Sequence, residues 1–346
     1  MRLEIAGRVV LGATMVALAV PAASEDTAVR TFFRRTIGLT EAQIAEVDAG
    51  RVVTRQLPGA DKPEMAAFGA VRVTSSKDTF LQRLRDLARF RQGPPSLQIG
   101  RFHTPPVPAD LDGLTLEDGD FDAARQCKPG DCDLKLARSA LERIRREIDW
   151  KAPDARARAT GLMKQMIVEY LAAYQRGGTA EMATDIDSAV PLDTPAEFRK
   201  VLAASPYLVQ YAPELQRYLE EYPKGAPAGA EDFFYWTKDK FGPKPTIAIN
   251  HVTIWRDPGD PSRAAVASKQ IYASHYFQAG LDLTALVDAP GTTGSFYLVD
   301  LYRARVDPPT GMLSGVLLGK IRGGIEQGVG DGLRKAKQRA EMPWGT

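Results

Sequence analysis

The last third of the chain carries the clearest alternation of hydrophobic and polar residues. Four runs rich in β-branched and aromatic residues follow one another, at 246–255, 264–277, 281–287 and 295–306. The connections between them are short and rich in Gly, Pro and Asp, so the pattern predicts an antiparallel meander. Apolar residues then recur at every fourth position from Leu313 to Leu333, which predicts one long helix over 312–339.

The part of the chain before the meander shows three kinds of pattern. Two runs, 51–57 and 65–74, have strand character, and Ser75 then precedes a helix with one apolar face. From 93 to 135 the sequence is irregular and rich in proline, whereas from 137 to 220 its periodicity is helical. Strands and helices in this mixture, without a βαβ alternation, predict an α+β fold.

The first residues have the organisation of a secretory signal peptide. A positively charged start with Arg2 and Arg8 precedes an apolar run over 9–20, and small residues follow up to Ala22. A buried N-terminal helix is the alternative, but the composition changes abruptly to polar residues just after this segment. The sequence therefore predicts cleavage of residues 1–22 and a periplasmic or secreted mature protein.

Composition and charge exclude several classes of protein. The 346 residues are 44% hydrophobic and 25% charged, as in ordinary globular proteins and unlike disordered chains. The net charge is +2, so the chain has no general electrostatic attraction for nucleic acid. No apolar run reaches the roughly 18 residues of a membrane span, and we expect none in the mature protein.

Two cysteines, Cys127 and Cys132, enclose the sequence Lys-Pro-Gly-Asp. Pro-Gly is a turn signal, so the two thiols are expected to meet, and in an oxidising compartment they form a disulfide. A redox pair would normally have the spacing C-x-x-C. A zinc site would need more Cys or His nearby, and none lies within about 20 residues. We therefore predict a disulfide and no metal site.

The order of elements resembles a known superfamily. The strand AFGAVRVTSS leads into the helix KDTFLQRLRDLARF, and successive antiparallel strands and one long C-terminal helix follow much later. This order is similar to the helix-grip fold of the START and polyketide-cyclase-like (SRPBCC) superfamily. The resemblance covers 65–91 and 245–340. It implies a curved antiparallel sheet around the C-terminal helix, with a cavity between them that commonly binds lipids or other apolar molecules.

These patterns and the resemblance divide the chain into four parts. They are the signal peptide at 1–22; helices, first strands and a helix of the core at 23–92; an irregular and helical insertion at 93–240; and the antiparallel meander with the C-terminal helix at 241–346. The insertion departs from the simple helix-grip fold, which carries more strands at this point of the chain.

The simplest hairpins of the meander predict which side chains share a face. They place Trp255 opposite Ala265, Phe277 opposite Leu281, and Val287 opposite Phe296, because this register keeps apolar residues together. The cavity-lining residues predicted on that face are His251, Trp255, Lys269, His275, Phe277, Asp300 and Tyr302. An apolar face with a few convergent polar groups is typical of a small-molecule site, although single residues of these types are also common in ordinary cores.

Three hypotheses about function follow. The first is an exported, non-enzymatic protein that binds an apolar, lipid-like molecule between sheet and helix, without a cofactor. The second is a hydrolase or cyclase that uses His275, Asp300 and His251. The third is an interaction module that offers the helices of 137–222 to a protein partner. The sequence contains no G-x-S-x-G, H-E-x-x-H or phosphate-loop motif that would favour a particular reaction.

Overall fold

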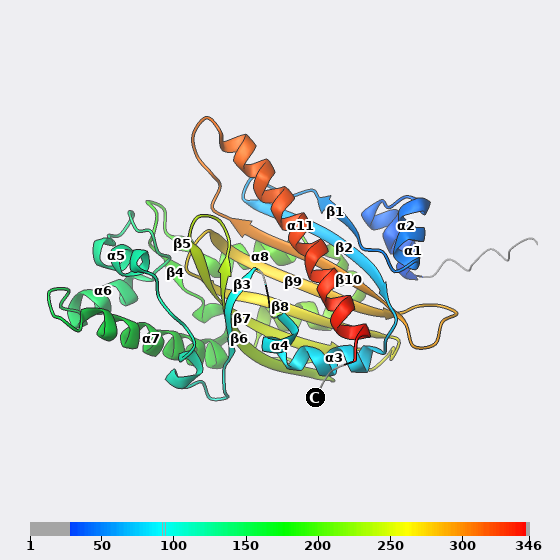
Figure 1. Cartoon of the computed structure of the whole chain (residues 1–346), viewed down its shortest axis with the longest axis horizontal. Helices are drawn as coiled ribbons and strands as arrows, with labels where there is room; N and C mark the ends of the chain where they lie inside the picture. The colour runs from blue at the N-terminus through cyan, green and yellow to red at the C-terminus, as the bar shows by residue number, and fades with distance from the viewer. Residues whose placement is uncertain (1–27, 92, 94, 344–346) are drawn as a thin grey trace, which may run out of the picture.

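The computed structural model describes residues 28–91, 93 and 95–343, so the predicted signal peptide lies outside the described residues. An eight-stranded antiparallel sheet forms the centre, in the order β1-β2-β10-β9-β8-β7-β6-β3 (Figure 1). Its strands are β1 (Val53–Leu57), β2 (Glu64–Val73), β3 (Ser96–Arg101), β6 (Ala230–Lys240), β7 (Pro245–Arg256), β8 (Arg263–Ala273), β9 (Phe277–Asp288) and β10 (Phe296–Val306). The predicted α+β class and the meander are confirmed. The sheet also takes β3 and β6 from the 93–240 segment, where the pattern predicts only irregular and helical structure.

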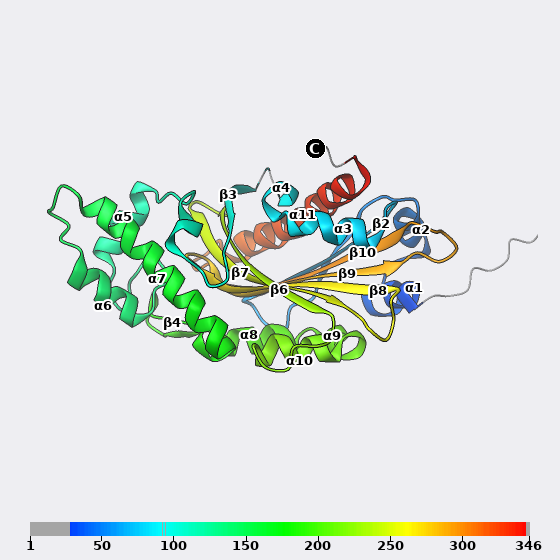
Figure 2. The ribbon, with the colours of Figure 1, turned by 90° about the horizontal axis from the view of Figure 1, so that it is seen from below.

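One face of the sheet is covered by α11 (Ser314–Glu341), α3 (Lys77–Arg85) and α4 (Leu87–Arg91), as Figures 1 and 2 show. The long C-terminal helix α11 packs on β1, β2 and β10. Close approach requires glycine in β2, because a Cβ at Gly69 would lie 2.5 Å from Leu333 Cδ1 and 2.7 Å from Val329 Cγ1. The predicted ridge of apolar residues at every fourth position is buried only from Ile325 onward, and Leu313 is 68% exposed. Four residues turn a helix by ~400°, so such a ridge drifts around the helix.

The opposite face carries helices from the start and the middle of the described chain. They are α1 (Ala28–Thr31), η1 (Phe32–Ile37), α2 (Glu41–Asp48), α8 (Thr194–Ala203), α9 (Pro206–Tyr211) and α10 (Pro213–Glu221). Figure 2 shows α8, α9 and α10 below the sheet, on the side away from α11. The sheet is therefore covered on both faces, and its two sides support separate apolar cores. Among the described residues, no helix is long and apolar enough to cross a membrane.

A third group of helices extends past one end of the sheet (Figure 1). It comprises α5 (Asp118–Gln126), α6 (Arg138–Glu147) and α7 (Ala155–Gly177), with the short elements η2 (Pro108–Leu111), η3 (Gly178–Glu181), β4 (Thr184–Asp185) and β5 (Leu192–Asp193) nearby. α7 is capped by Gly178, whose φ is +68° and at which a Cβ would overlap the Tyr222 carbonyl oxygen. Only glycine fits there, and this contact ties the end of α7 to the segment after α10.

The predicted disulfide between Cys127 and Cys132 is present, in the turn between α5 and α6. The backbone N–H of Gly130 donates to the Ile186 carbonyl oxygen at 2.8 Å, and that of Cys132 donates to Asp187 at 3.0 Å. The closed turn therefore supports the chain segment that carries β4.

The register of the meander agrees with prediction in one hairpin and differs in two. Trp255 pairs with Ala265, as expected. In the next hairpin Leu281 pairs with Lys269 and not with Phe277, because 274–276 form the loop and Gly280 lies inside β9. In the last, Val287 pairs with Tyr297 and not with Phe296. This last shift of one residue turns every side chain of β10 to the other face.

Candidate functional site

The structure separates the predicted cavity-lining residues into three places. His251, Trp255 and Lys269 lie on the sheet face covered by the insertion helices. Asp300 and Tyr302 lie on the α11 face because the register of β10 is shifted, and Phe277 lies there at the register irregularity between β9 and the end of β10. His275 lies in the β8–β9 loop. The predicted set is therefore no single site, and the expectation of one shared face is wrong.

His251 lies in a buried hydrogen-bond network. Its Nε2 is 2.9 Å from Asp232 Oδ1, and its Nδ1 is 3.1 Å from the Tyr174 hydroxyl. Asp232 also accepts from the hydroxyls of Tyr218 at 2.5 Å and Thr253 at 2.7 Å. Burial lowers the pKa of His251, and the Asp232 carboxylate offsets only part of that effect. Both ring nitrogens have protein partners, so the network is built to hold β6, β7 and the helices together.

Lys269 is fully buried beside this network and also has internal partners. Its Nζ donates to Thr179 Oγ1 at 2.7 Å and to the Leu219 carbonyl oxygen at 3.0 Å. It lies 4.1 Å from the centre of the Phe198 ring, and no carboxylate of the described residues is within salt-bridge distance. Burial lowers its pKa far below the ordinary value, and Glu220 offsets little of this, so the neutral amine is favoured.

A polar group on the α11 face surrounds Asp300. Arg91 donates to the Tyr235 hydroxyl at 2.5 Å and lies 3.8 Å from Asp282. Burial raises the pKa of Asp300 well above its ordinary value, the neighbouring Asp282 carboxylate raises it further, and Arg91 opposes both. The three candidate catalytic residues thus have different neighbours: Asp300 has Asp282, His251 has Asp232, and the His275 Nε2 lies 3.8 Å from Asp120.

A cavity lies apart from all three of these places, between α5, α6, α7 and the ends of β7 and β8. It has a volume of about 160 Å³ and largely apolar walls. The helices contribute residues such as Phe121, Ala140, Ile144, Ala159, Met163 and Met166, and the sheet contributes Ile247, Ile249 and Tyr272. None of the residues predicted from the sequence lines it. It opens on the sheet face away from α11, where Ile247 and Ile249 point.

Six polar residues also line this cavity, and five of them have contacts within the protein. Tyr170 donates to the Ile271 carbonyl oxygen at 2.5 Å, and Tyr272 donates to that of Lys135 at 3.1 Å. The Lys135 ammonium donates to Asp187 and Asp307. Asp120 accepts from the Glu117 N–H at 2.8 Å, and Ser274 Oγ accepts from that of Ile247 at 2.9 Å.

The sixth polar residue is Asp185, in β4. It is 5% exposed, and its Oδ1 has no hydrogen-bond partner among the described residues. Burial raises the pKa of Asp185 to about 7; Lys135 lowers it, while the charges of Asp187 and Asp307 raise it. A buried acid with an unpaired oxygen costs free energy unless something else supplies a partner.

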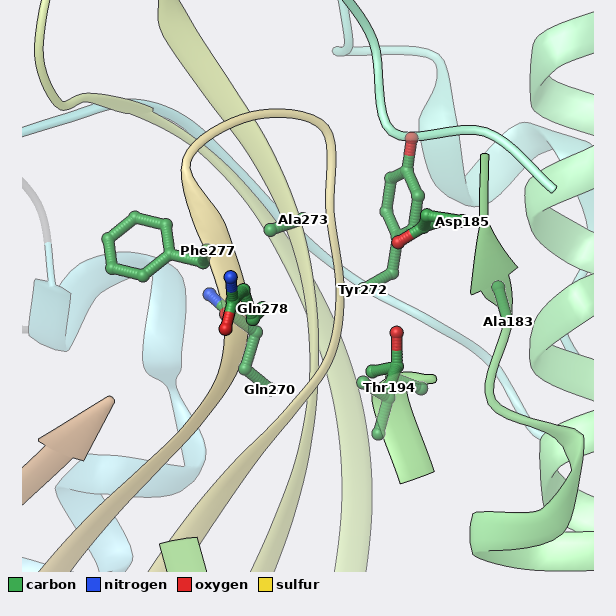
Figure 3. A pocket seen from close by; sticks show the side chains of 9 residues that line it. Ala183, Asp185, Thr194, Gln270, Tyr272, Ala273, Phe277 and Gln278 are labelled. Atoms are coloured by element: carbon green, nitrogen blue, oxygen red, sulfur yellow. The ribbon is translucent and has the colours of Figure 1, made fainter. Parts of the chain in front are cut away.

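Asp185 also lines a second, smaller pocket of about 10 Å³, which Figure 3 shows. Asp185, Tyr272 and Ala183 belong to both pockets. Thr194 lies below Asp185 in the view, and Gln270, Gln278 and Phe277 lie across the smaller pocket (Figure 3). The smaller pocket has room for about one water molecule. Phe277 lines it, and is the one predicted site residue that lines either pocket.

Sequence reasoning missed this cavity because its walls come from elements that are far apart along the chain. Each wall residue has the pattern of an ordinary helix or strand core. A weak signal exists in the short acidic segment TDIDS, where Asp185 and Asp187 flank Ile186. No group of three or more His, Cys, Asp or Glu within the described ranges could hold a metal ion.

Comparison of the sequence with models of known protein families and with curated proteins gave no match. The geometry and chemistry of the site are therefore the basis for a functional assignment.

Proposed function

We propose that this is an exported protein that binds a small apolar molecule in the cavity between α5, α6, α7 and the sheet. The observation that carries the proposal is the cavity of about 160 Å³, with apolar walls and few polar groups. That combination is typical of small-molecule sites. A cavity of roughly 150 Å³ lined by apolar side chains binds benzene in another protein. The occupant is therefore one ring, a short alkyl chain, or one end of a longer lipid-like molecule.

Export is proposed from the signal-peptide pattern at 1–22, and the disulfide supports it because such bonds persist in oxidising compartments. The antiparallel sheet with a long C-terminal helix agrees with the START-like resemblance at the level of architecture. Membership of the superfamily remains a proposal. The ligand position proposed here differs from the helix-grip expectation, since the cavity lies on the face away from α11.

The test compares two tryptophan substitutions in the same helix. Ala159 lines the cavity, whereas Ala157 is exposed on α7 and does not. Benzene binding is measured by isothermal titration calorimetry and by the rise in melting temperature. We expect binding to the wild type and to Ala157→Trp, and none to Ala159→Trp, which fills the cavity. Native mass spectrometry of the protein from its exporting host, with organic extraction, identifies any natural occupant.

Two results would contradict the proposal. One is a wild-type protein that binds no apolar probe at millimolar concentration. The other is an Ala159→Trp variant that is folded by circular dichroism and still binds benzene as the wild type does.

A further inference from the structure

We infer that Asp185 is the recognition group for a protonated amine at one end of the apolar ligand. The inference rests on the proposed function, because it requires the larger cavity to be a ligand site. It assigns the chemical class of that ligand as a small cationic amphiphile with a ring or short alkyl body.

The hydrogen-bond donors at the polar end of the cavity already have acceptors within the protein. Tyr170, Tyr272 and Lys135 direct their donors to protein oxygen atoms, and none of those is Asp185 Oδ1. That leaves a buried acceptor that lines both pockets and has no partner within the part of the chain that the structure describes. Such a group satisfies its hydrogen-bonding capacity when a ligand brings a donor.

Acidic side chains outnumber basic ones around that end of the cavity. One ammonium, that of Lys135, faces the carboxylates of Asp187 and Asp307 at 3.2 and 3.0 Å, and Asp185 is the third acid nearby. Asp120 adds a further acid to the cavity lining. The end of the cavity is therefore short of positive charge. A cationic ligand group supplies it, and an anionic group would be repelled.

Backbone hydrogen bonds hold Asp185 in a fixed position. Asp185 pairs with Leu192 in the short β4–β5 hairpin and bridges to Ala137 at the start of α6. The next residue, Ile186, donates to the Leu136 carbonyl oxygen at 3.0 Å and accepts from Gly130 in the disulfide turn. A carboxylate fixed in this way needs little reorganisation to receive a ligand.

Three probes of one shape and different charge test the inference: benzylamine, benzyl alcohol and benzoate. Each is titrated calorimetrically into the full mature protein, into Asp185→Asn, and into the control Asp133→Asn. Asp133 is an exposed acid in the preceding loop that pairs with Lys244 and does not line the cavity. We expect the wild type and the control to bind benzylamine about tenfold or more tightly than benzyl alcohol, with benzoate weakest.

Asp185→Asn is expected to lose about tenfold in benzylamine affinity and to keep its affinity for benzyl alcohol within roughly threefold. A second measurement avoids the variant altogether. Because the pKa of Asp185 is about 7, wild-type affinity for benzylamine should rise between pH 6 and pH 8, while that for benzyl alcohol stays level. The charged and titratable groups that interact with Asp185 are Lys135, Asp187, Asp307, Tyr170 and Tyr272, and Asp120 lines the same cavity.

The outcomes separate this inference from the function on which it rests. Equal binding of benzylamine and benzyl alcohol, or benzylamine binding that is insensitive to both Asp185→Asn and pH, would overturn the amine assignment and leave the apolar site intact. Binding of none of the three probes, nor of benzene, would overturn both.

Discussion

Lys269 gives the sharpest test of the electrostatics of the fold. The residue is fully buried, its Nζ donates to Thr179 and Leu219, and burial lowers its pKa far below the ordinary value of 10.5. We therefore expect the native state to hold a neutral amine, whereas the lysine of the unfolded chain is protonated at neutral pH. We predict that Lys269→Met, which keeps the length and removes the titrating group, abolishes a large pH dependence of stability.

The sign and size of the effect follow from proton linkage. Below pH 10.5 the unfolded state binds a proton that the native state does not, so unfolding becomes easier as the pH falls. Each pH unit is worth about 1.4 kcal/mol once the unfolded lysine is fully protonated. With 10.5 as the unfolded pKa, stability should rise by about 2.6 kcal/mol from pH 8 to pH 10 because of Lys269 alone.

The methionine variant also loses two hydrogen bonds, which leaves the Leu219 carbonyl oxygen without its Lys269 donor. That loss is worth about 1–3 kcal/mol and does not vary with pH. The diagnostic quantity is therefore the change in unfolding free energy with pH, not the unfolding free energy at any one pH.

The measurement is urea unfolding at pH 8, 9 and 10 for the wild type, Lys269→Met and the control Lys224→Met, an exposed lysine. Differences between variants cancel the titration of all other groups, including the buried tyrosines. We expect the unfolding free energies of the wild type and the control to rise by the same amount from pH 8 to pH 10. That of Lys269→Met should rise by about 2.6 kcal/mol less. The same change in unfolding free energy with pH for all three proteins would show that Lys269 is charged in the native state, and would refute the reasoning.

Three further predictions concern the fold. Asp232→Ala removes the acceptor for His251 and should lower the free energy of unfolding by about 3 kcal/mol in urea titrations; a loss below about 1 kcal/mol would mean that the network is dispensable. Gly69→Ala should destabilise by about 1–3 kcal/mol, since its Cβ meets the side chains of α11; an unchanged melting temperature would contradict that close approach. The double variant Cys127→Ser/Cys132→Ser should lose about 2 kcal/mol and bind benzene more weakly, because the turn supports one wall of the cavity; full retention of benzene affinity would separate the disulfide from the site.

Local periodicity predicts those parts of the fold that bury one face of a regular element. The four strands of the meander, β2 and α11 have such patterns, and each is present. Local periodicity does not predict β3 and β6. β3 is a short edge strand. β6 contains the unbroken apolar run FFYW because both of its faces are covered, so it shows no alternation.

Strand register depends on where each turn lies, and this is where prediction from the sequence failed. The segment around Gly280 looks like a turn, yet Gly280 lies inside β9 opposite Gln270. The chain reverses instead at Tyr276, whose φ of +61° is unusual for a residue with a side chain. A bulky residue in that conformation is held by tertiary contacts, such as the hydrogen bond from the Lys244 N–H to its hydroxyl. No local sequence pattern predicts such a turn.

The cavity could not be predicted, for a different reason. It forms where α5, α6 and α7 pass the end of the sheet, so its shape depends on the angle at which separate elements meet. Asp185, the residue with most consequence for the proposed ligand, lies in a strand of two residues. A strand that short has no period to detect.

The size of the cavity and the charge of Asp185 together set an upper limit on the affinity that a ligand can reach. Residual cavities in protein cores cost about 24 cal/mol per Å³, so filling about 160 Å³ recovers at most about 4 kcal/mol. That alone corresponds to a dissociation constant of about 1 mM. A charged hydrogen bond to Asp185 adds about 2 kcal/mol, which brings the constant to roughly 40 μM. For the proposed ligand, apolar contact alone would therefore give only millimolar binding of a ring, and the hydrogen bond to the Asp185 carboxylate would be needed for selective binding at micromolar concentration.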